Sequence, residues 1–187
     1  TLENMTVFPQ GGVSRRNGSR FVCEVKDSTA ITRLIPFEFN ITQAYVLEFG
    51  NNYIRFLKDN GQITEATKTI SGITAANPAV VTATSHGYSD GDDVWIADVV
   101  GMTRLNGRRF TVANKTTNTF ELTDENSTSY TAWSSGGTAS KTYQITTTYT
   151  SAELYDLQFT QSADVMYIVH PDHPPAKLSR TAHTTWT

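Results

Sequence analysis

The sequence has a single cysteine, no long apolar run and only a small excess of negative over positive charge. The 187 residues contain one cysteine, Cys23, which excludes an internal disulfide bond and a cysteine-rich zinc site. No apolar stretch approaches the roughly 20 residues that a membrane-spanning helix needs, and no signal peptide is recognisable. We therefore expect no membrane span, and the single thiol fits assembly in a cytoplasm. Because Thr1 is not an initiator residue, we also expect a preceding piece of the protein to be missing.

The small excess of charge argues against a general nucleic-acid binder. The formal net charge is −3, whereas such a binder carries a basic patch. The acidity is concentrated in residues 72–140, where seven acidic side chains accompany four basic ones, and the remainder has 11 of each sign. The sequence has no phosphate-binding loop, GxSxG elbow or HExxH helix. We expect no catalysis and no cofactor.

What the sequence does contain is a series of short strand signals. Runs of β-branched and aromatic residues are separated by turns rich in glycine and asparagine. No heptad or 3.6-residue pattern competes with them. The expected strands cover residues 21–25, 31–39, 44–49, 53–58, 80–82, 94–96, 109–112, 119–122, 143–148 and 163–169. The fold is therefore predicted to be all-β and mainly antiparallel.

One segment, residues 151–159, has the features of a short helix. Ser151 can cap the amide of Leu154, and Leu157 and Gln158 continue a helical spacing. The helix would have about two turns, so tertiary contacts must stabilise it.

The expected strand at residues 163–169 is apolar on both faces, so we expect it to be covered on both sides. The sequence HPDHPP follows at residues 170–175. Proline has no amide donor and a fixed φ, so the ladder is expected to end here.

Composition changes near Ser71-Gly72 and again near Gly136-Gly137. Between these points, strands of about four or five residues recur every 10–15 residues or so, which is typical of a small antiparallel barrel or sandwich. An insertion into an exposed hairpin leaves the host strands paired. We predict a host β domain made of residues 1–71 and 141–187, interrupted by an inserted small β-barrel at residues 72–140.

Several strings carry a family resemblance. They are GGVSRR at residues 11–16, TRLIPFEFNITQAYVLEFGNNYIRF at 32–56, FTQSADVMYIVHPDHPPAKL at 159–178 and HTTWT at 183–187. Together they resemble the nozzle proteins of short-tailed bacteriophages, also called tail tubular protein B or phage stabilisation protein. Members of this family are longer on both sides, so the chain looks like an excerpt.

The resemblance implies a structural role in the tail of a phage or prophage virion that is assembled in the bacterial cytoplasm. It implies self-association as a ring in the full-length protein, contacts with tail adaptor proteins, and passive contact with phage DNA in the channel. These expectations rest on analogy of fold and family.

The strings SHGYSDGDDVWIADVVGMTRLNGRRFTV and TNTFELT, at residues 85–112 and 117–123, resemble a second kind of module. It occurs in phage tail and fibre proteins and is labelled ubiquitin-activating-enzyme FCCH-like. No cysteine lies in residues 72–140, and thioester chemistry needs a thiolate, so the resemblance implies a β-barrel shape only. The likeness to fibre modules leaves a carbohydrate-binding adhesin as the alternative function. Trp133 could stack on a sugar, although packing is the expected role of all three tryptophans.

One basic cluster is a candidate contact site. Arg15, Arg16 and Arg20 surround Asn17-Gly18. In the functional interpretation their guanidinium groups face DNA phosphates in the channel or carboxylates of a neighbouring subunit. In the alternative interpretation they belong to a solvated turn.

Two clusters suggest metal binding only weakly. His170 and His173 are two ligands in a proline-bounded turn, and zinc needs three or four. Asp90, Asp92 and Asp93 surround a glycine turn, but EF-hand spacing is absent. No pair of carboxylates is marked out for glycoside hydrolysis. We expect no metal site.

Overall fold

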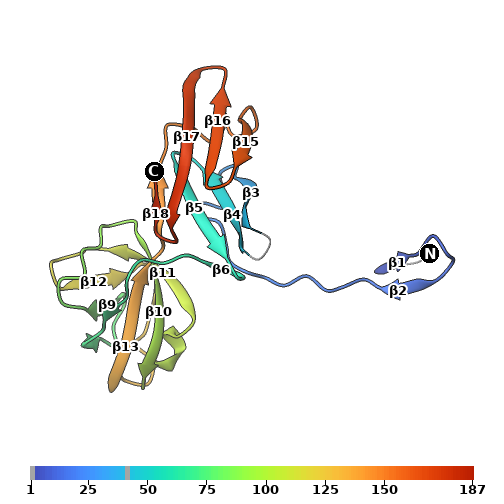
Figure 1. Cartoon of the computed structure of the whole chain (residues 1–187). Coiled ribbons are helices and arrows are strands. Elements are labelled where there is room, and N and C mark those ends of the chain that lie inside the picture. The colour runs from blue at the N-terminus through green and yellow to red at the C-terminus, as the bar shows by residue number, and fades with distance from the viewer. Residues whose placement is uncertain (1–2, 41–42) are drawn as a thin grey trace.

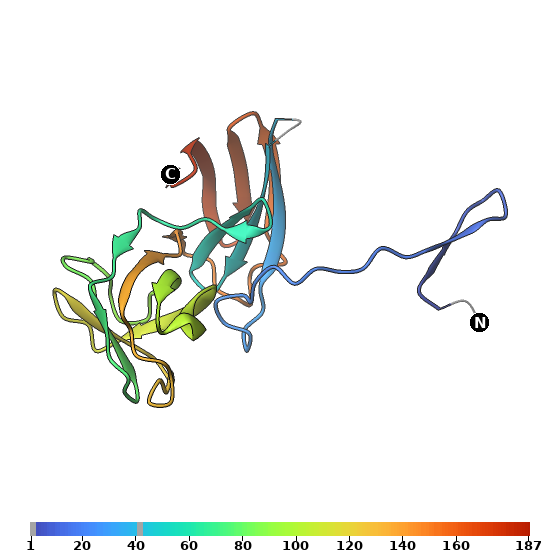
Figure 2. The same ribbon diagram turned by 90° about the horizontal axis from the view of Figure 1, so that it is seen from below.

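The computed structural model describes residues 3–40 and 43–187. All of its strand ladders are antiparallel. The only helical element in these ranges is the 3-10 turn η1 (Thr103–Leu105). The all-β, antiparallel prediction is confirmed. A thin N-terminal arm projects from two lobes (Figures 1 and 2). No described helix is long and apolar enough to cross a membrane.

The N-terminal arm comprises residues 3–20. It contains a hairpin of β1 (Met5–Val7) and β2 (Val13–Arg15). In the turn, the amide of Phe8 donates to the Gly12 carbonyl at 2.8 Å. Every described residue of the arm is exposed, and an extended segment carries the hairpin away from both lobes (Figure 2).

The sandwich lobe comprises residues 33–63 and 143–187. One sheet has the order β14-β5-β4-β3, with β6 paired to β5, and the other has the order β15-β16-β17-β18. Their bounds are β3 (Arg33–Asn40), β4 (Gln43–Gly50), β5 (Tyr53–Lys58), β6 (Gly61–Gln62), β14 (Gln144–Thr146), β15 (Gln158–Ser162), β16 (Val165–His170), β17 (His173–Ala182) and β18 (Thr185–Trp186).

Both sheets contribute to one hydrophobic cluster. Trp186 of β18 lies at its centre, with ring centroids 4.9 Å from Phe37 and 4.4 Å from Phe56. β4 and β5 form a hairpin, with Gly50 opposite Tyr53. A Cβ atom at Gly50 would overlap the Tyr53 ring, so glycine is required there.

The curled lobe comprises residues 68–141. Its sheet has the order β7-β13-β10-β11-β12-β9-β8. The strands are β7 (Lys68–Thr69), β8 (Gly72–Ile73), β9 (Ala79–Thr82), β10 (Asp93–Val100), β11 (Arg108–Ala113), β12 (Thr119–Leu122) and β13 (Ser135–Lys141). A second hydrophobic cluster, made of residues between Ile70 and Ala139, fills the concave side.

The curled lobe is not the closed barrel that we expected. The continuous stretch 68–73 forms both ends of its sheet, because the amide of Ile70 donates to Gly137 while the next amide, of Ser71, donates to Thr82. No ladder among the described strands joins β7 directly to β8. The sheet therefore curls back on itself but stays open.

Two predicted elements are wrong. Residues 21–25 are irregular; side chains hold this segment, since Glu48 accepts from the Lys26 amide and Gln62 donates to the Glu24 carbonyl. Residues 151–156 form turns instead of a helix. Arg33 donates to the carbonyls of Leu154 and Leu157, and in the predicted helix the Leu154 carbonyl would instead have accepted from the Gln158 amide.

Two expectations about β16 are also wrong. The strand is buried on one face only: Tyr167 and Val169 are 49% and 43% exposed. The prolines do not end the ladder either, because β17 begins at His173 and includes Pro174 and Pro175. The register shifts between Ile168 and His170, opposite these prolines, so the missing amides fall where regular pairing is interrupted.

Candidate functional site

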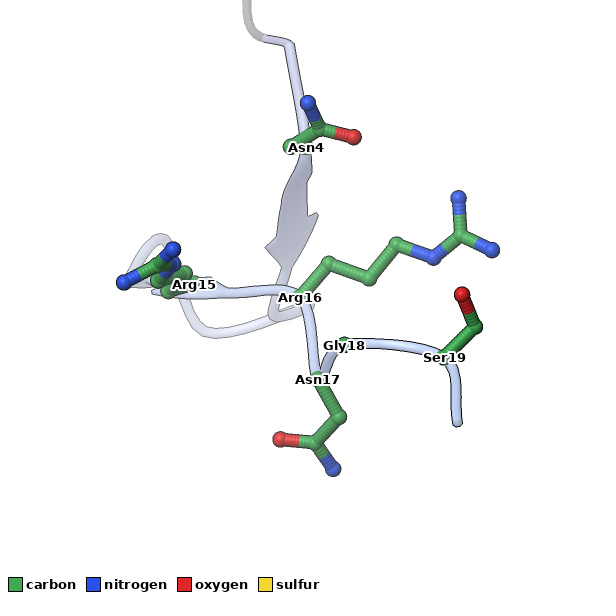
Figure 3. Close-up of a pocket in the computed structure, with 6 residues that line it drawn as sticks. All are labelled: Asn4, Arg15, Arg16, Asn17, Gly18 and Ser19. Atoms are coloured by element: carbon green, nitrogen blue, oxygen red, sulfur yellow. The ribbon is translucent and has the colours of Figure 1, made fainter. Parts of the chain in front are cut away.

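The predicted arginine cluster lies on the N-terminal arm. Arg15 ends β2, Arg16 follows it, and Arg20 lies farther along the extended segment. The Arg16 amide donates to the Asn4 carbonyl at 2.8 Å, which fixes the base of the hairpin. An open recess of about 570 Å³ lies here, lined by Asn4, Arg15, Arg16, Asn17, Gly18 and Ser19 (Figure 3).

The arginine side chains do not converge on one point. Figure 3 shows Arg15 and Arg16 pointing to opposite sides of the chain, and Arg20 does not line the recess. Within residues 3–40 and 43–187, none of the three makes a side-chain hydrogen bond or ion pair. Such exposed guanidinium groups can contact an extended anionic surface but do not form a closed phosphate clamp.

A second surface feature is an apolar groove on the outer face of the sheet β14-β5-β4-β3. It has a volume of about 330 Å³. The groove is lined by Val22, Cys23, Val25, Leu34, Ala44, Val46, Glu48, Leu57, Lys58, Asp59 and Asn60. Leu34 and Val46 are 60% and 39% exposed. This sheet therefore has an uncovered apolar area on the face opposite its core.

The adjacent part of the same face is covered by the curled lobe. Arg55 of β5 has a side chain only 2% exposed, and its Nη2 lies 2.5 Å from Oδ2 of Asp93 in β10. Arg55 Nε also donates to Gln144 at 3.3 Å, and Thr111 donates to the other Asp93 oxygen at 3.2 Å. Arg55 therefore pairs the two lobes through a desolvated ion pair.

Other cations surround this junction. Burial lowers the pKa of Arg109, whose guanidinium donates to the Thr142 hydroxyl. Burial, followed by repulsion from Arg55, lowers the pKa of Lys26. Burial also raises the pKa of the nearby Cys23 thiol, which favours its unreactive protonated form. The junction thus has the features of a structural contact between lobes.

The HPDH turn brings its two histidines together. The rings of His170 and His173 are 5.0 Å apart, and His173 Nε2 lies 3.2 Å from a Glu153 oxygen. Hydrogen bonds from the backbone and hydroxyl of Thr150, followed by one from His173, lower the pKa of Glu153 to about 2. Among the described residues, no group of three or more potential ligands is arranged to hold a metal ion. This cluster orders the turns at residues 150–156.

The three aspartates of the YSDGDD turn each have a different protein partner. Asp90 accepts from the Lys115 amide at 3.0 Å, Asp92 accepts from the Ser89 amide at 2.8 Å, and Asp93 pairs with Arg55. Their oxygens are used in separate contacts, so the turn does not gather them around one cation.

The tryptophans act in packing. Trp186 is in the core of the sandwich lobe, and Trp95 lies beneath Arg109, with 5.4 Å between the guanidinium carbon and the ring centroid. Trp133 packs against the core of the curled lobe, and its Nε1 donates to the Gly136 carbonyl at 3.0 Å. This contact holds the indole against its own turn.

Comparison with known proteins finds a similarity for one part of the chain. Residues 76–142 match the family described as ubiquitin-activating enzyme E1 FCCH domain. The match covers most of the curled lobe, and Cys23 lies outside it. No curated protein matches the chain.

Two features of these surfaces were not predicted from the sequence. Arg55 occupies the polar position of an alternating strand, and it is buried under the curled lobe. The second feature is the groove, which contains Leu34, Val46 and Leu57. The sequence does indicate an apolar outer face here, because apolar residues occur on both faces of β3, β4 and β5.

Proposed function

We propose that this chain is a structural segment of the tail nozzle of a short-tailed phage or prophage. The observation that carries the proposal is that the strings resembling nozzle proteins, at residues 32–56 and 159–178, lie in one lobe and share one hydrophobic cluster. The two segments are separated by about a hundred residues of intervening chain, yet they are parts of a single packed unit. This arrangement is expected if both segments belong to one nozzle-like domain that an insertion interrupts.

The arm supports a contact role within this proposal. It presents Arg15, Arg16 and Arg20 on an extended, exposed segment beyond the lobes. In a ring around DNA, such a segment reaches either a phosphate backbone or the acidic surface of a neighbouring subunit. The fold supplies reach and charge, and the contact needs no catalytic group.

Deletion and complementation in the phage or prophage that carries the gene test this function. Particles without the protein should lack a complete tail and lose packaged DNA, as seen by negative-stain electron microscopy and by nuclease sensitivity of the DNA. Complementation with the unchanged gene should restore both properties. Complete, DNA-retaining, infectious particles in the deletion strain would overturn the proposal.

A charge reversal on the arm tests the contact site separately. The triple variant Arg15→Glu, Arg16→Glu and Arg20→Glu should fail to complement the deletion. Lys115→Glu, at an exposed turn of the curled lobe, is the matched control and should complement. Equal complementation by both variants would remove the arm arginines from the proposed contact.

A further inference from the structure

The hairpin at the end of the arm lacks a packing partner among the described residues of its own chain. Its apolar side chains Met5, Val7, Phe8 and Val13 are between 45% and 60% exposed. An isolated two-stranded hairpin is at best marginally stable in water, and a third surface is needed to cover its apolar residues. The exposed apolar side chains of the arm are therefore suited to bind another apolar surface.

The groove on the sandwich lobe is such a surface. It lies on the outer face of β3, β4 and β5, at the limit of the area that the curled lobe covers through Arg55 and Asp93. Leu34 and Val46 are exposed within it, while Leu57 is half-buried. An occupant would continue the coverage that the curled lobe begins.

The edge of this sheet favours docking on the face over addition of a strand. β3 is the end strand, but Pro36 has no amide to offer a new partner. At Glu38 the side chain of Gln161 already binds both backbone groups, at 3.1 Å for the amide and 2.8 Å for the carbonyl. The edge is therefore blocked at two of its positions.

Charge also distinguishes the arm from the rest of the chain. Residues 1–20 contain Arg15, Arg16 and Arg20 against Glu3, a net charge of +2, whereas residues 21–71 and 141–187, which form the groove-bearing part of the chain, have 8 basic and 10 acidic side chains, a net charge of −2. The groove itself is lined by Glu48 and Asp59 against Lys58, a net charge of −1, and the Asp59 side chain is 84% exposed. Opposite charges on arm and groove-bearing surface favour their association and guide its orientation.

We propose that the arm of one copy binds the groove of a second copy. The contact is heterologous, since one patch meets a different patch on the neighbour, and repetition around an axis closes a ring. This inference deepens the proposed function and rests on it, because it names the subunit contact of the nozzle. The groove is small, so isolated copies associate weakly and a covalent capture method suits the test.

Cross-linking between two differently marked chains provides that test. Both carry Cys23→Ser; one also carries Phe8→Cys in the arm, and the other carries Leu34→Cys in the groove. The probe is a short bis-maleimide. The mixture should yield the arm–groove heterodimer in about tenfold excess over a mixture in which Thr117→Cys, on an exposed turn, replaces Leu34→Cys. Equal yields would overturn the proposal.

A further pair of variants separates exchange between copies from folding back. A chain carrying both Phe8→Cys and Leu34→Cys at low concentration should give little internally cross-linked monomer; a predominant internal cross-link would overturn exchange. Adding Val46→Lys to the groove-marked chain should abolish the heterodimer while leaving the circular dichroism spectrum unchanged. An undiminished yield would overturn the role of the groove.

Failure of this inference differs from failure of the proposed function. If deletion of the gene removes tails but no arm–groove cross-link forms, the function stands and the subunit contact lies elsewhere. If cross-links form but virions are complete without the protein, self-association stands and the tail role is wrong.

Discussion

The ion pair between the lobes makes an asymmetric prediction about stability. Arg55 is almost fully buried, whereas its partner Asp93 has an 18% exposed side chain. Removing one member of a buried pair leaves the other charge without compensation, at a cost of about 3–5 kcal/mol. The cost should therefore depend on which member remains.

Asp93→Asn leaves the buried guanidinium of Arg55 without a charged partner. The amide keeps an oxygen that can accept from Arg55, so we expect the lower end of the range, a loss of about 3 kcal/mol. Arg55→Met leaves Asp93, which water and Thr111 can still reach, and should cost about 1 kcal/mol or less. The double variant should resemble Arg55→Met alone, because neither charge then remains buried and unpaired.

Urea unfolding followed by tryptophan fluorescence measures these differences. With a slope of about 2–3 kcal/mol/M, Asp93→Asn should lower the midpoint by about 1 M. Asp59→Asn is the matched control, since the Asp59 side chain is 84% exposed and its pair with Lys58 should contribute less than about 0.5 kcal/mol. Equal small losses for Asp93→Asn and Arg55→Met would refute the claim that this pair is desolvated.

Four further outcomes are expected. Glu153 has a pKa of about 2 in the folded chain against an ordinary 4.5, so its stabilising contribution is full above pH 4.5 and is lost as the pH falls towards 2. Glu153→Gln should therefore lower the thermal unfolding temperature of the protein at pH 7 but not at pH 2. A difference between variant and parent that is the same at both pH values would contradict this. Cys23→Ser should leave folding intact, and the native thiol should react with a disulfide reagent more slowly than free cysteine at pH 8, because burial raises its pKa. Residues 68–142 expressed alone should give a dispersed proton NMR spectrum, since they contain the second hydrophobic cluster; a collapsed spectrum would show that this lobe needs the other. Gly101→Ala, where φ is +88° and the new Cβ would overlap the Ala132 carbonyl, should cost more than about 2 kcal/mol in chemical unfolding, whereas Gly87→Ala at φ +74° with open space should cost about 1 kcal/mol.

Local patterns predicted the strands that are bounded by strong turns. The predicted ranges 53–58 and 119–122 coincide with β5 and β12. Each run has β-branched or aromatic residues next to a glycine or asparagine turn, and such signals depend only on neighbouring residues. The all-β class of the fold could therefore be predicted from short segments of the sequence.

Elements that depend on distant partners were not predictable in this way. Residues 21–25 have strand composition but no paired strand; the Glu24 carbonyl instead accepts from Gln62, and the amide of the following Lys26 donates to Glu48. Arg33, far away in the sequence, holds the turned segment by donating to the carbonyls of Leu154 and Leu157, the first of which a helix would have used internally. Tertiary contacts override local propensity in both places.

The candidate site shows the same division. The arginines of GGVSRR were recognised from sequence as a basic cluster, and the structure places them on the arm. The apolar residues on both faces of β3, β4 and β5 are visible in the sequence, but whether the outer face is open depends on how far the curled lobe extends over the sheet. Burial of Arg55 depends on the same placement.

The pairing of Thr64 with Thr142 has a practical consequence for engineering. These residues face each other in an antiparallel bridge at the base of the curled lobe, and the amide of Ile63 reaches Phe56 while that of Tyr143 reaches Ile63. A short turn could join the two threonines directly and leave β5 and β14 in register. Loss of the lobe would also return Arg55 to water, so no charge would be trapped. The position can therefore accept a grafted cargo domain, provided that the ends of the cargo lie as close together as the two strands of a hairpin.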